Sequence, residues 1–593
     1  IKLLLKTGIL SEPLPARPWK NGTIDKVTGL PKMLPPVKSK KSFKRLRQEI
    51  KRVCLENNFP IKLTAKGQEL EKAGELLEDG EVGPTTFTAI GDNGTAKEWL
   101  CSHFNDQEEE SEEDEPTVCK VCKKEAKAQG YKLKKILRRS EVICTDKDMI
   151  GQIAHLDPVM DQYEDWQGLQ KLVTTELPRI SGTVVHSPFK ILVKTTRTSS
   201  FELKEGAQKG KRALYPSWNG QNVDPRVRHC AVPRPGFVYF SVDYAASNLV
   251  SLGYTCLKLF GESVLADTIN AEIDPHARLA SALAFYFDEK FRKACEAQGF
   301  DDGQSMEVFK LFDQQKKATE DNYGKLQTKH PLTGQMIEGT EFWKYGFPKP
   351  PNYENGGTWK GGSFWKNSRS LAKPTGLGYP GGLGPDKFIA FARATYKIVV
   401  TREEAVAMRE IWKATFTEMP EYLKYISDQL KDPTSGYDEY GRPKGYCYQS
   451  PLGMHRARAD FCAAANGFGL QTPEAEGVKL ATIALQKEIF TNKKSILYGN
   501  VRCISLIHDE FFGEVRYEDP EACDARIKRI QEIITKPMAD LMVGMRVGTT
   551  GCIMRRWLKS AEPMFQERNG KKILVPYDDV VVPEEIKKLR GIV

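Results

Sequence analysis

Two short apolar stretches that each end in an aspartate are the part of this sequence best suited to chemistry. One runs from Phe237 to Asp243, and the other runs from Cys503 through Asp509 and Glu510. A carboxylate where a buried strand leaves the core is costly to desolvate unless a cation or a charged ligand compensates it. Two such carboxylates therefore indicate one shared metal-binding site. Either stretch taken alone is better explained by an aspartate that caps an element or forms an ion pair.

These carboxylates need strands to position them, and the flanking residues predict strands. Both stretches consist mainly of β-branched, aromatic and aliphatic residues, as buried strands do. The residues after Glu510 are again apolar, so the second stretch fits a hairpin that turns at His508-Asp509-Glu510. Between the two stretches, Arg369 and Lys373 are spaced i, i+4, which places both cations on one helical face and suits a polyphosphate.

In this order the segments resemble motifs A and C of family A DNA polymerases, the bacterial DNA polymerase I type that is also found in bacteriophages, with the fingers helix of that family between them. The resemblance covers residues 40–565 and implies an α+β right-hand polymerase, with an antiparallel palm sheet and a helical thumb and fingers. Further segments resemble the TGR-x-SS, QN-x-P, D-x-H, N-x3-Q and R-W-x-K-A segments of the family, in the order Thr195–Ser200, Gly220–Pro225, Asp274–His276, Asn466–Gln471 and Arg555–Ala561.

The resemblance also implies a division of the chain. The segment Glu12–Trp19 resembles the junction between an exonuclease module and the polymerase in phage relatives. No Asp-x-Glu segment with matching acidic residues precedes the palm, so we expect no 3′–5′ exonuclease in this chain. The expected parts are a linker or junction at 1–37, a thumb at 38–175 with an acidic insertion at 104–118, palm segments at 176–265 and 435–593, and fingers at 266–434 with an insertion at 285–365.

The chemistry that the resemblance implies is nucleotidyl transfer with two Mg²⁺ ions as cofactors. Asp243, Asp509 and the carbonyl of Tyr244 would hold the ions, which make the primer 3′-hydroxyl nucleophilic and neutralise the leaving pyrophosphate. Glu510 is expected as a third catalytic residue in an outer shell or on the primer side, with a surface acid at the turn as the alternative. His508 would support the primer terminus, or else be a packed histidine at a strand end.

Contacts to the nucleotide and to DNA follow from the same resemblance. Lys373 and Arg369 would clamp the triphosphate, with help from His276. The minor groove shows nearly the same acceptors for every base pair, so contacts there check pair geometry without reading sequence. The side chains expected at the minor groove are Arg197, Asn222, Asn466 and Gln471.

The sequence departs from the family pattern at the nucleotide site. Asn248 stands where the family has a Glu that crowds the sugar 2′ position, which leaves discrimination against ribonucleotides open. Leu377 replaces the Phe or Tyr that packs on the incoming nucleotide, so dideoxynucleotides should be poorly incorporated. Gly381 stands at the following Tyr position, with Tyr379 nearby as a candidate nucleotide contact. The N-x3-Q segment is also one residue longer than in the family, which makes Asn466 the weaker match of its two polar ends.

Two insertions carry further candidates. Around the acidic insertion, Cys-x-His and Cys-x2-Cys could close a zinc knuckle, although unrelated thiols on a thumb insertion are the preferred interpretation. In the fingers insertion, three tryptophans beside lysines could stack on single-stranded template, although the apolar core of a small subdomain explains them better. The residues concerned are Cys101, His103, Cys119 and Cys122 for zinc, and Trp343, Trp359 and Trp365 for stacking.

Composition agrees with these expectations without deciding between them. The chain has 593 residues, a hydrophobic fraction of 40% and a net charge of +10, which favour a sizeable core and a polyanionic partner. It has no apolar run long enough to predict a membrane span. The scattered cysteines suit reduced thiols in a cytoplasm, that of the host if the gene is phage-encoded. We expect a monomer that binds primer–template DNA and deoxynucleoside triphosphates, with other replisome proteins as further candidate partners.

The expected activity is therefore DNA-templated DNA synthesis in replication. A single-subunit RNA polymerase is an alternative that Asn248 favours and the QN-x-P and N-x3-Q matches oppose. A polymerase that also accepts RNA templates is a second. A non-catalytic DNA-binding relative is a third, which the retained aspartates and phosphate-binding cations oppose.

Overall fold

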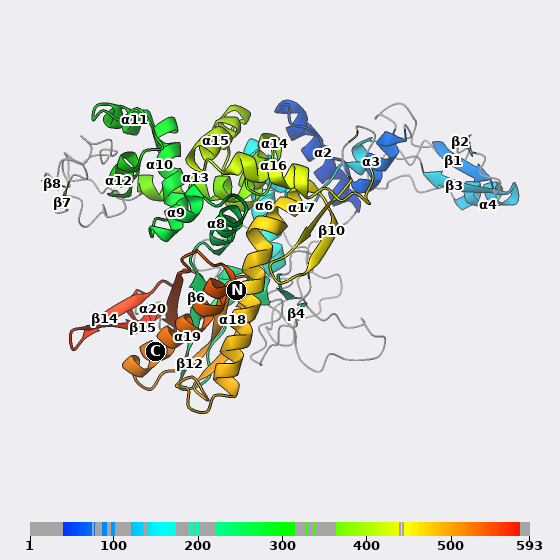
Figure 1. Ribbon diagram of the computed structural model, residues 1–593. Coiled ribbons are helices and arrows are strands. Elements are labelled where there is room, and N and C mark those ends of the chain that lie inside the picture. The colour runs from blue at the N-terminus through cyan, green and yellow to red at the C-terminus, as the bar shows by residue number, and fades with distance from the viewer. Residues whose placement is uncertain are drawn as a thin grey trace, which may run out of the picture. The chain divides into compact units, whose positions relative to one another are not determined.

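The computed structural model divides the chain into two compact units, Ile1–Thr175 (unit 1) and Glu176–Val593 (unit 2) (Figure 1). The boundary coincides with the expected end of the thumb at residue 175, and the naming of the parts as thumb, palm and fingers stays a prediction. The structure describes residues 40–73, 76, 86–91, 96–100, 120–135, 139–172, 189–190, 193, 197–200, 220–314, 327–329, 336–338, 363–437, 441 and 444–581.

Unit 1 is held together by a small apolar core on one helix. Leu46, Ile50 and Val53 lie on the inner face of α2 (Lys40–Glu56) and pack with Ile143 and Met149. A separate antiparallel sheet has the strand order β2-β1-β3. The remaining elements are α3 (Ala65–Lys72), β1 (Thr86–Gly91), β2 (Ala96–Leu100), α4 (Lys120–Ala128), β3 (Tyr131–Lys135), α5 (Lys147–Ile153) and α6 (Pro158–Lys171).

Unit 2 is built around a four-stranded sheet, called here the central sheet, with the order β11-β12-β6-β13 and antiparallel pairing throughout. Both strands predicted from the aspartate-ended stretches are present, and the expected hairpin between β11 and β12 is confirmed because Ile507 pairs with Glu510 across the turn. The strands are β6 (Phe237–Tyr244), β11 (Val501–Ile507), β12 (Glu510–Arg516) and β13 (Thr549–Met554).

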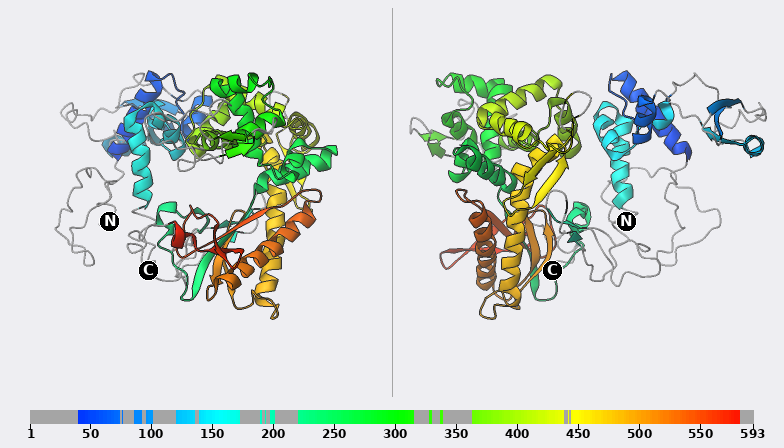
Figure 2. Two further views of the ribbon diagram at one scale, coloured as in Figure 1. Left: turned by 90° about the vertical axis from the view of Figure 1, so that its left-hand side faces the viewer. Right: turned by 45° about the vertical axis from the view of Figure 1, so that its right-hand side comes forward.

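The two faces of the central sheet differ. Along β6, Val238, Phe240, Val242 and Tyr244 share one face and are buried, because alternate residues of a strand point the same way. The Tyr244 hydroxyl donates to the carbonyl of Ile534 (2.7 Å) on α19 (Pro520–Leu541), so that helix covers this face. Figures 1 and 2 show α18 (Thr472–Phe490) and α19 side by side along the sheet. Asp243, which lies between two of these buried positions, therefore belongs to the opposite face.

A group of helices occupies the chain between the strands (Figure 1). Among them α13 (Ser363–Gly378) confirms the helix predicted to carry Arg369 and Lys373, and it packs on α10 (Pro275–Phe287). The others are α8 (Ser247–Phe260), α9 (Val264–Asn270), α11 (Glu289–Glu296), α12 (Met306–Gln314), α14 (Pro385–Tyr396), α15 (Arg402–Thr415) and α16 (Met419–Gln429), and a short helix, α7 (Pro225–Arg228), precedes β6.

A nearly continuous helix leads back to the central sheet. It consists of α17 (Phe461–Ala465), a π-helical segment (Asn466–Gln471) and α18. No helix in the described part of the chain is both long and apolar enough to cross a membrane. The remaining elements are β4 (Phe189–Lys190), β5 (Ser199–Ser200), β7 (Gln327–Lys329), β8 (Met336–Glu338), β9 (Tyr446–Gln449), β10 (His455–Ala459), β14 (Met564–Arg568), β15 (Lys571–Val575) and α20 (Tyr577–Val580).

Candidate active site

Three carboxylates meet at one end of the central sheet. Asp243 on β6 pairs with Glu510 on β12, and Asp509 lies in the turn immediately before Glu510. Two non-glycine residues beside them adopt the left-handed backbone region, His508 at φ 61° and Ala246 at φ 52°. Each such conformation costs about 1–3 kcal/mol and persists only where the surroundings impose it. The chain therefore accepts strain on both sides of this carboxylate group.

The negative charge of this group is only partly compensated. Burial and the nearby Asp509 and Glu510 carboxylates raise the pKa of Asp243 to about 8. Burial also raises the pKa of Glu510, although Ser241 donates a hydrogen bond to it (Oγ to Oε1, 2.6 Å) and Arg228 opposes the shift. Asp243 keeps solvent-accessible surface although protein atoms crowd around it, so the raised pKa also reflects the close approach of like charges, which persists unless a cation intervenes. The arrangement therefore favours a bound cation.

The donor set fits Mg²⁺. Among the residues that the structure describes, no three ligating side chains already converge on one metal position. Mg²⁺ does not need such a cage, because it commonly binds one or two carboxylates and takes its other ligands from water and substrate phosphate. Asp243 and Asp509 supply two hard oxygen donors of this kind, and the role of the Tyr244 carbonyl as a further ligand stays a prediction.

A fourth carboxylate, Glu474 on α18, joins this site and was not anticipated from the sequence. Its side chain is only 1% exposed and forms an ion pair with Arg197 (2.5 Å). Ser247 Oγ lies 3.0 Å from Glu474 Oε1 and 2.5 Å from Asp509 Oδ2, so it links the two acids. Burial raises the pKa of Glu474 to about 7 in spite of Arg197. A single Glu in a helix is normally predicted to be a surface residue, and no sequence pattern distinguished Glu474 from such residues.

Arg197 and Asn248 were predicted in different roles but lie in contact. Arg197 Nη2 donates to Asn248 Oδ1 at 2.9 Å. His508 lies close enough that the Arg197 charge, after burial, helps to lower its pKa. The structure therefore brings a predicted minor-groove residue, a predicted sugar-contact residue and a predicted primer-side residue together beside the carboxylates.

The predicted phosphate-binding residues also lie together, on α10 and α13. Arg369 Nε donates to Asp274 Oδ2 at 2.6 Å, so this cation is already paired. Burial and Arg369 lower the pKa of Lys373, and within the described chain its ammonium has no recorded hydrogen-bond or ion-pair partner. His276 is buried, its Nδ1 lacks a partner in the described residues, and burial lowers its pKa to about 4. A neutral imidazole and two cations thus share one helix interface.

The prediction that Tyr379 contacts the nucleotide does not fit the structure. Its side chain is fully buried, it stacks on Phe388 with ring centroids 4.4 Å apart, and its hydroxyl donates to the Ala405 carbonyl. Helix α13 ends one residue earlier, so the chain turns Tyr379 into the core. Leu377 is partly buried against the same core.

The π-helical segment explains the extra residue in the N-x3-Q match. A π turn accommodates one residue more than an α turn, so Asn466 and Gln471 stay in one helix despite the longer spacing. Asn466 Nδ2 donates to the Gly381 carbonyl at 3.4 Å, and a Cβ at Gly381 would lie 2.5 Å from that same nitrogen. Asn466 therefore takes up the space that a side chain at position 381 would need.

The two polar residues of the QN-x-P segment lie in different environments. Gln221 is buried, accepts from the Ser200 amide (2.7 Å) and donates to the Leu506 carbonyl (2.8 Å), which ties the segment carrying Arg197 to β11. Its neighbour Asn222 is exposed. The role of Asn222 at a minor groove stays a prediction.

The insertion candidates are only partly described. Of the zinc set, only Cys122 is described, and it is buried against Ala89 and Ala126. Trp365 stacks on Phe312 with centroids 6.4 Å apart and packs against the main apolar core of unit 2, and a separate core for the insertion stays a prediction. The acidic insertion and the predictions for Cys101, His103, Cys119, Trp343 and Trp359 lie outside the described residues.

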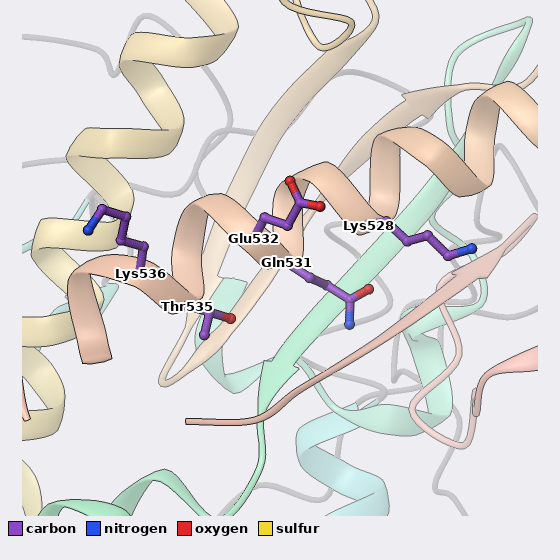
Figure 3. A pocket seen from close by; sticks show the side chains of 5 residues that line it. All are labelled: Lys528, Gln531, Glu532, Thr535 and Lys536. Carbon is purple, nitrogen blue, oxygen red and sulfur yellow. The ribbon is translucent and has the colours of Figure 1, made fainter. Parts of the chain in front are cut away.

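A hollow of about 560 Å³ on α19 is a poor candidate for the site (Figure 3). All three of its charged side chains already pair elsewhere, Lys528 with Asp524, Glu532 with Arg529 and Lys536 with Asp540. None of the residues that line the hollow belongs to the carboxylate group. The lining residues are Lys528, Gln531, Glu532, Thr535 and Lys536.

Two known proteins show a distant likeness to this chain. A DNA polymerase I of Aquifex aeolicus (strain VF5) is 26% identical over 195 residues, which are 32% of this chain and 30% of that protein. The polymerase domain of Pol1 from M. smegmatis, solved with DNA primer–template and dNTP, is 16% identical with a TM-score of 0.41 and covers 70% of this chain and 56% of that one. No family model matches. The sequence match thus supports a likeness to DNA polymerase I over a third of the chain.

Proposed function

We propose that this protein is a DNA-templated DNA polymerase of the family A type, which extends a primer from deoxynucleoside triphosphates in DNA replication. The observation that carries the proposal is the carboxylate group at the end of the central sheet, where Asp243 and Asp509 lie close together and the negative charge is only partly compensated. The likeness to DNA polymerase I supports the same conclusion. In this proposal the central sheet is the palm, and the helices from α9 to α16 belong to the fingers.

The residues of the site divide the work of phosphoryl transfer. When bound, two Mg²⁺ ions would supply the charge that activates the primer hydroxyl and neutralises the leaving group. Asp243 and Asp509 would hold them, and Ser247 keeps Asp509 in place through its hydroxyl. Glu510, held by Ser241, would remain behind these two as a supporting acid.

The helix α13 would bind the triphosphate. Lys373 has no competing partner in the described structure, so its ammonium is free to meet phosphate oxygens. Arg369 would exchange its bond with Asp274 for one with the substrate. The neutral His276 can donate one hydrogen bond without adding a third positive charge, because its pKa lies near 4.

The test is primer extension by the purified chain. We expect extension of a DNA primer on a DNA template with Mg²⁺ and deoxynucleotides, and loss of extension when EDTA is added. The same assay with ribonucleotides, and then with an RNA template, separates this function from the RNA polymerase and RNA-templated alternatives. Tight DNA binding without any extension would contradict the proposal and favour a non-catalytic DNA-binding protein.

A further inference from the structure

Glu474 is the least exposed acid near the carboxylate site, and its contacts are unusually specific. Its Oε2 accepts from both Nε (3.1 Å) and Nη2 (2.5 Å) of Arg197. Its Oε1 lies 3.0 Å from Ser247 Oγ, and it must share the single hydrogen of that hydroxyl with Asp509 Oδ2, which lies 2.5 Å from the same oxygen. Burying a carboxylate costs free energy unless it is paired and hydrogen-bonded. The pairing of Glu474 with Arg197 therefore indicates that its role is to hold that side chain.

These contacts fix the plane of the Arg197 guanidinium. Nε and one hydrogen of Nη2 are used by Glu474, and the other hydrogen of Nη2 is directed at Asn248 Oδ1. Within the described residues, Nη1 is left with no recorded partner. The Arg197 side chain is 23% exposed, so it reaches solvent in spite of its buried anchor. Arginine held by one edge of its fork presents the other edge in a defined direction.

The Asn248 amide is oriented by the same chain of contacts. A guanidinium can only donate, so the Asn248 oxygen must face Arg197 and its NH₂ must face away. In the described structure that NH₂ group has no recorded bond. The site therefore offers two neighbouring sets of donors, from Arg197 Nη1 and Asn248 Nδ2, both set in place by one buried acid.

We propose that Glu474 is a positioning residue that holds Arg197, and through it Asn248, as a preformed pair of donors for the minor-groove acceptors of the primer-terminal base pair. This inference rests on the proposed polymerase function. Correct pairs place minor-groove acceptors in nearly the same positions whatever the sequence, and mispairs displace them. A donor pair that cannot move to follow a displaced acceptor discriminates better than a mobile one, because the ordering cost is met before binding.

The chain provides a matched control two residues away. Glu476 is also a buried acid on α18, but it accepts from Ser450 and from the Leu452 amide and makes no contact with Arg197. Glu476→Gln therefore reports what a buried amide in this helix does to folding. Glu474→Gln reports that effect together with loss of the anchor for Arg197.

The experiment measures single-turnover extension from matched and from mismatched primer ends. We expect Glu474→Gln to slow matched extension about tenfold and to slow mismatched extension much less, so that discrimination falls. Arg197→Ala should do the same, and the double variant should be no worse than Arg197→Ala, because Glu474 acts through Arg197. Glu476→Gln should keep the wild-type ratio of matched to mismatched rates.

Two outcomes would overturn the inference while the polymerase function stands. One is a Glu474→Gln variant that retains its discrimination, and the other is a double variant whose loss is the product of the two single losses. If Glu474→Gln does not fold, Arg197→Lys replaces it as the test. A lysine has no second edge to present, so it should lose discrimination in a folded protein, and retained discrimination would refute the inference. Absence of extension by the wild-type chain would instead refute the proposed function.

Discussion

The carboxylate group on the central sheet and the cationic face of α13 handle charge in opposite ways. On the sheet, like charges are gathered and the pKa of Asp243 is raised to about 8 by burial and by its acidic neighbours. On α13, Arg369 is already neutralised by Asp274 at 2.6 Å. The other predicted phosphate-binding cation, Lys373, has no recorded partner among the described residues. The sheet region thus has an excess of negative charge, whereas on α13 one of the two cations already has its counter-charge.

This difference indicates how each region responds to its ligand. The sheet should gain stability when a cation binds, because binding removes the repulsion that raises the carboxylate pKa. The helix should gain less from a triphosphate, since Arg369 must give up one carboxylate partner to bind another. When a triphosphate binds at α13, Arg369 exchanges one anionic partner for another. When a cation binds at the sheet, it neutralises negative charge that was only partly compensated.

Loss of Lys373 should have the largest effect on the helix side. Lys373→Ala should lower the single-turnover rate by about 10²–10³-fold, because the ammonium acts where charge develops on the phosphates. Affinity for primer–template should change little. Lys366→Ala, at an exposed position of the same helix, is the matched control. Collapse of DNA binding with unchanged nucleotide affinity would show that α13 does not bind the triphosphate.

Because the carboxylates of the central sheet have too little counter-charge, the free energy of unfolding should depend on pH. The folded-state pKa of Asp243 lies above its unfolded value, so the folded state binds more protons and the free energy of unfolding falls as pH rises from about 4 to 8. We expect a measurable fall in metal-free protein, reduced by the solvent that reaches the exposed Asp243 side chain. Asp243→Asn should flatten this slope, and Mg²⁺ should reduce it. Denaturant unfolding across this pH range measures it, and a slope of the opposite sign would contradict the assignment.

Release of Arg369 should have a smaller effect, in the opposite direction. Asp274→Asn keeps an N-cap for α10, since Asn caps as well as Asp, but it removes the charge that occupies Arg369. The KM for the nucleotide should then fall about threefold to tenfold. A rise in KM would show that Asp274 positions Arg369 and does not compete with the substrate for it.

The smallest effect concerns the sugar. Leu377 offers neither a ring nor a hydroxyl, so Leu377→Tyr should raise incorporation of dideoxynucleotides relative to normal nucleotides by about tenfold or less. The ratio of single-turnover rates measures this. A flat ratio would show that Leu377 does not lie under the sugar, and Tyr379 is no substitute because it is buried in the core.

The sequence was informative where local pattern and chemistry coincide. Apolar runs that end in Asp243 and Asp509 predict strands, their pairing and a carboxylate site, because period and burial are local properties. The spacing of Arg369 and Lys373 predicts a helix for the same reason. The extra residue before Gln471 was visible, but its accommodation as a π turn depends on packing of the whole helix.

The sequence was uninformative where tertiary packing decides. Tyr379 was assigned by its distance from the helix motif, yet the end of α13 turns it into the core. Glu474 is an ordinary helical residue in sequence, and it becomes part of the site only because α18 brings it beside Arg197 and Ser247. Neither fact can be read from spacing.

The central claim, that Asp243 and Asp509 hold the catalytic metal ions, is tested most directly by their amide variants. Asp243→Asn and Asp509→Asn are measured in single-turnover primer extension and in DNA binding, with Asp540→Asn, an exposed acid on α19, as the control. The account predicts that each amide variant loses extension by about 10³-fold or more while primer–template affinity stays near the wild-type value, since affinity comes mostly from phosphate contacts. Extension above about one percent of wild type in either variant would contradict it.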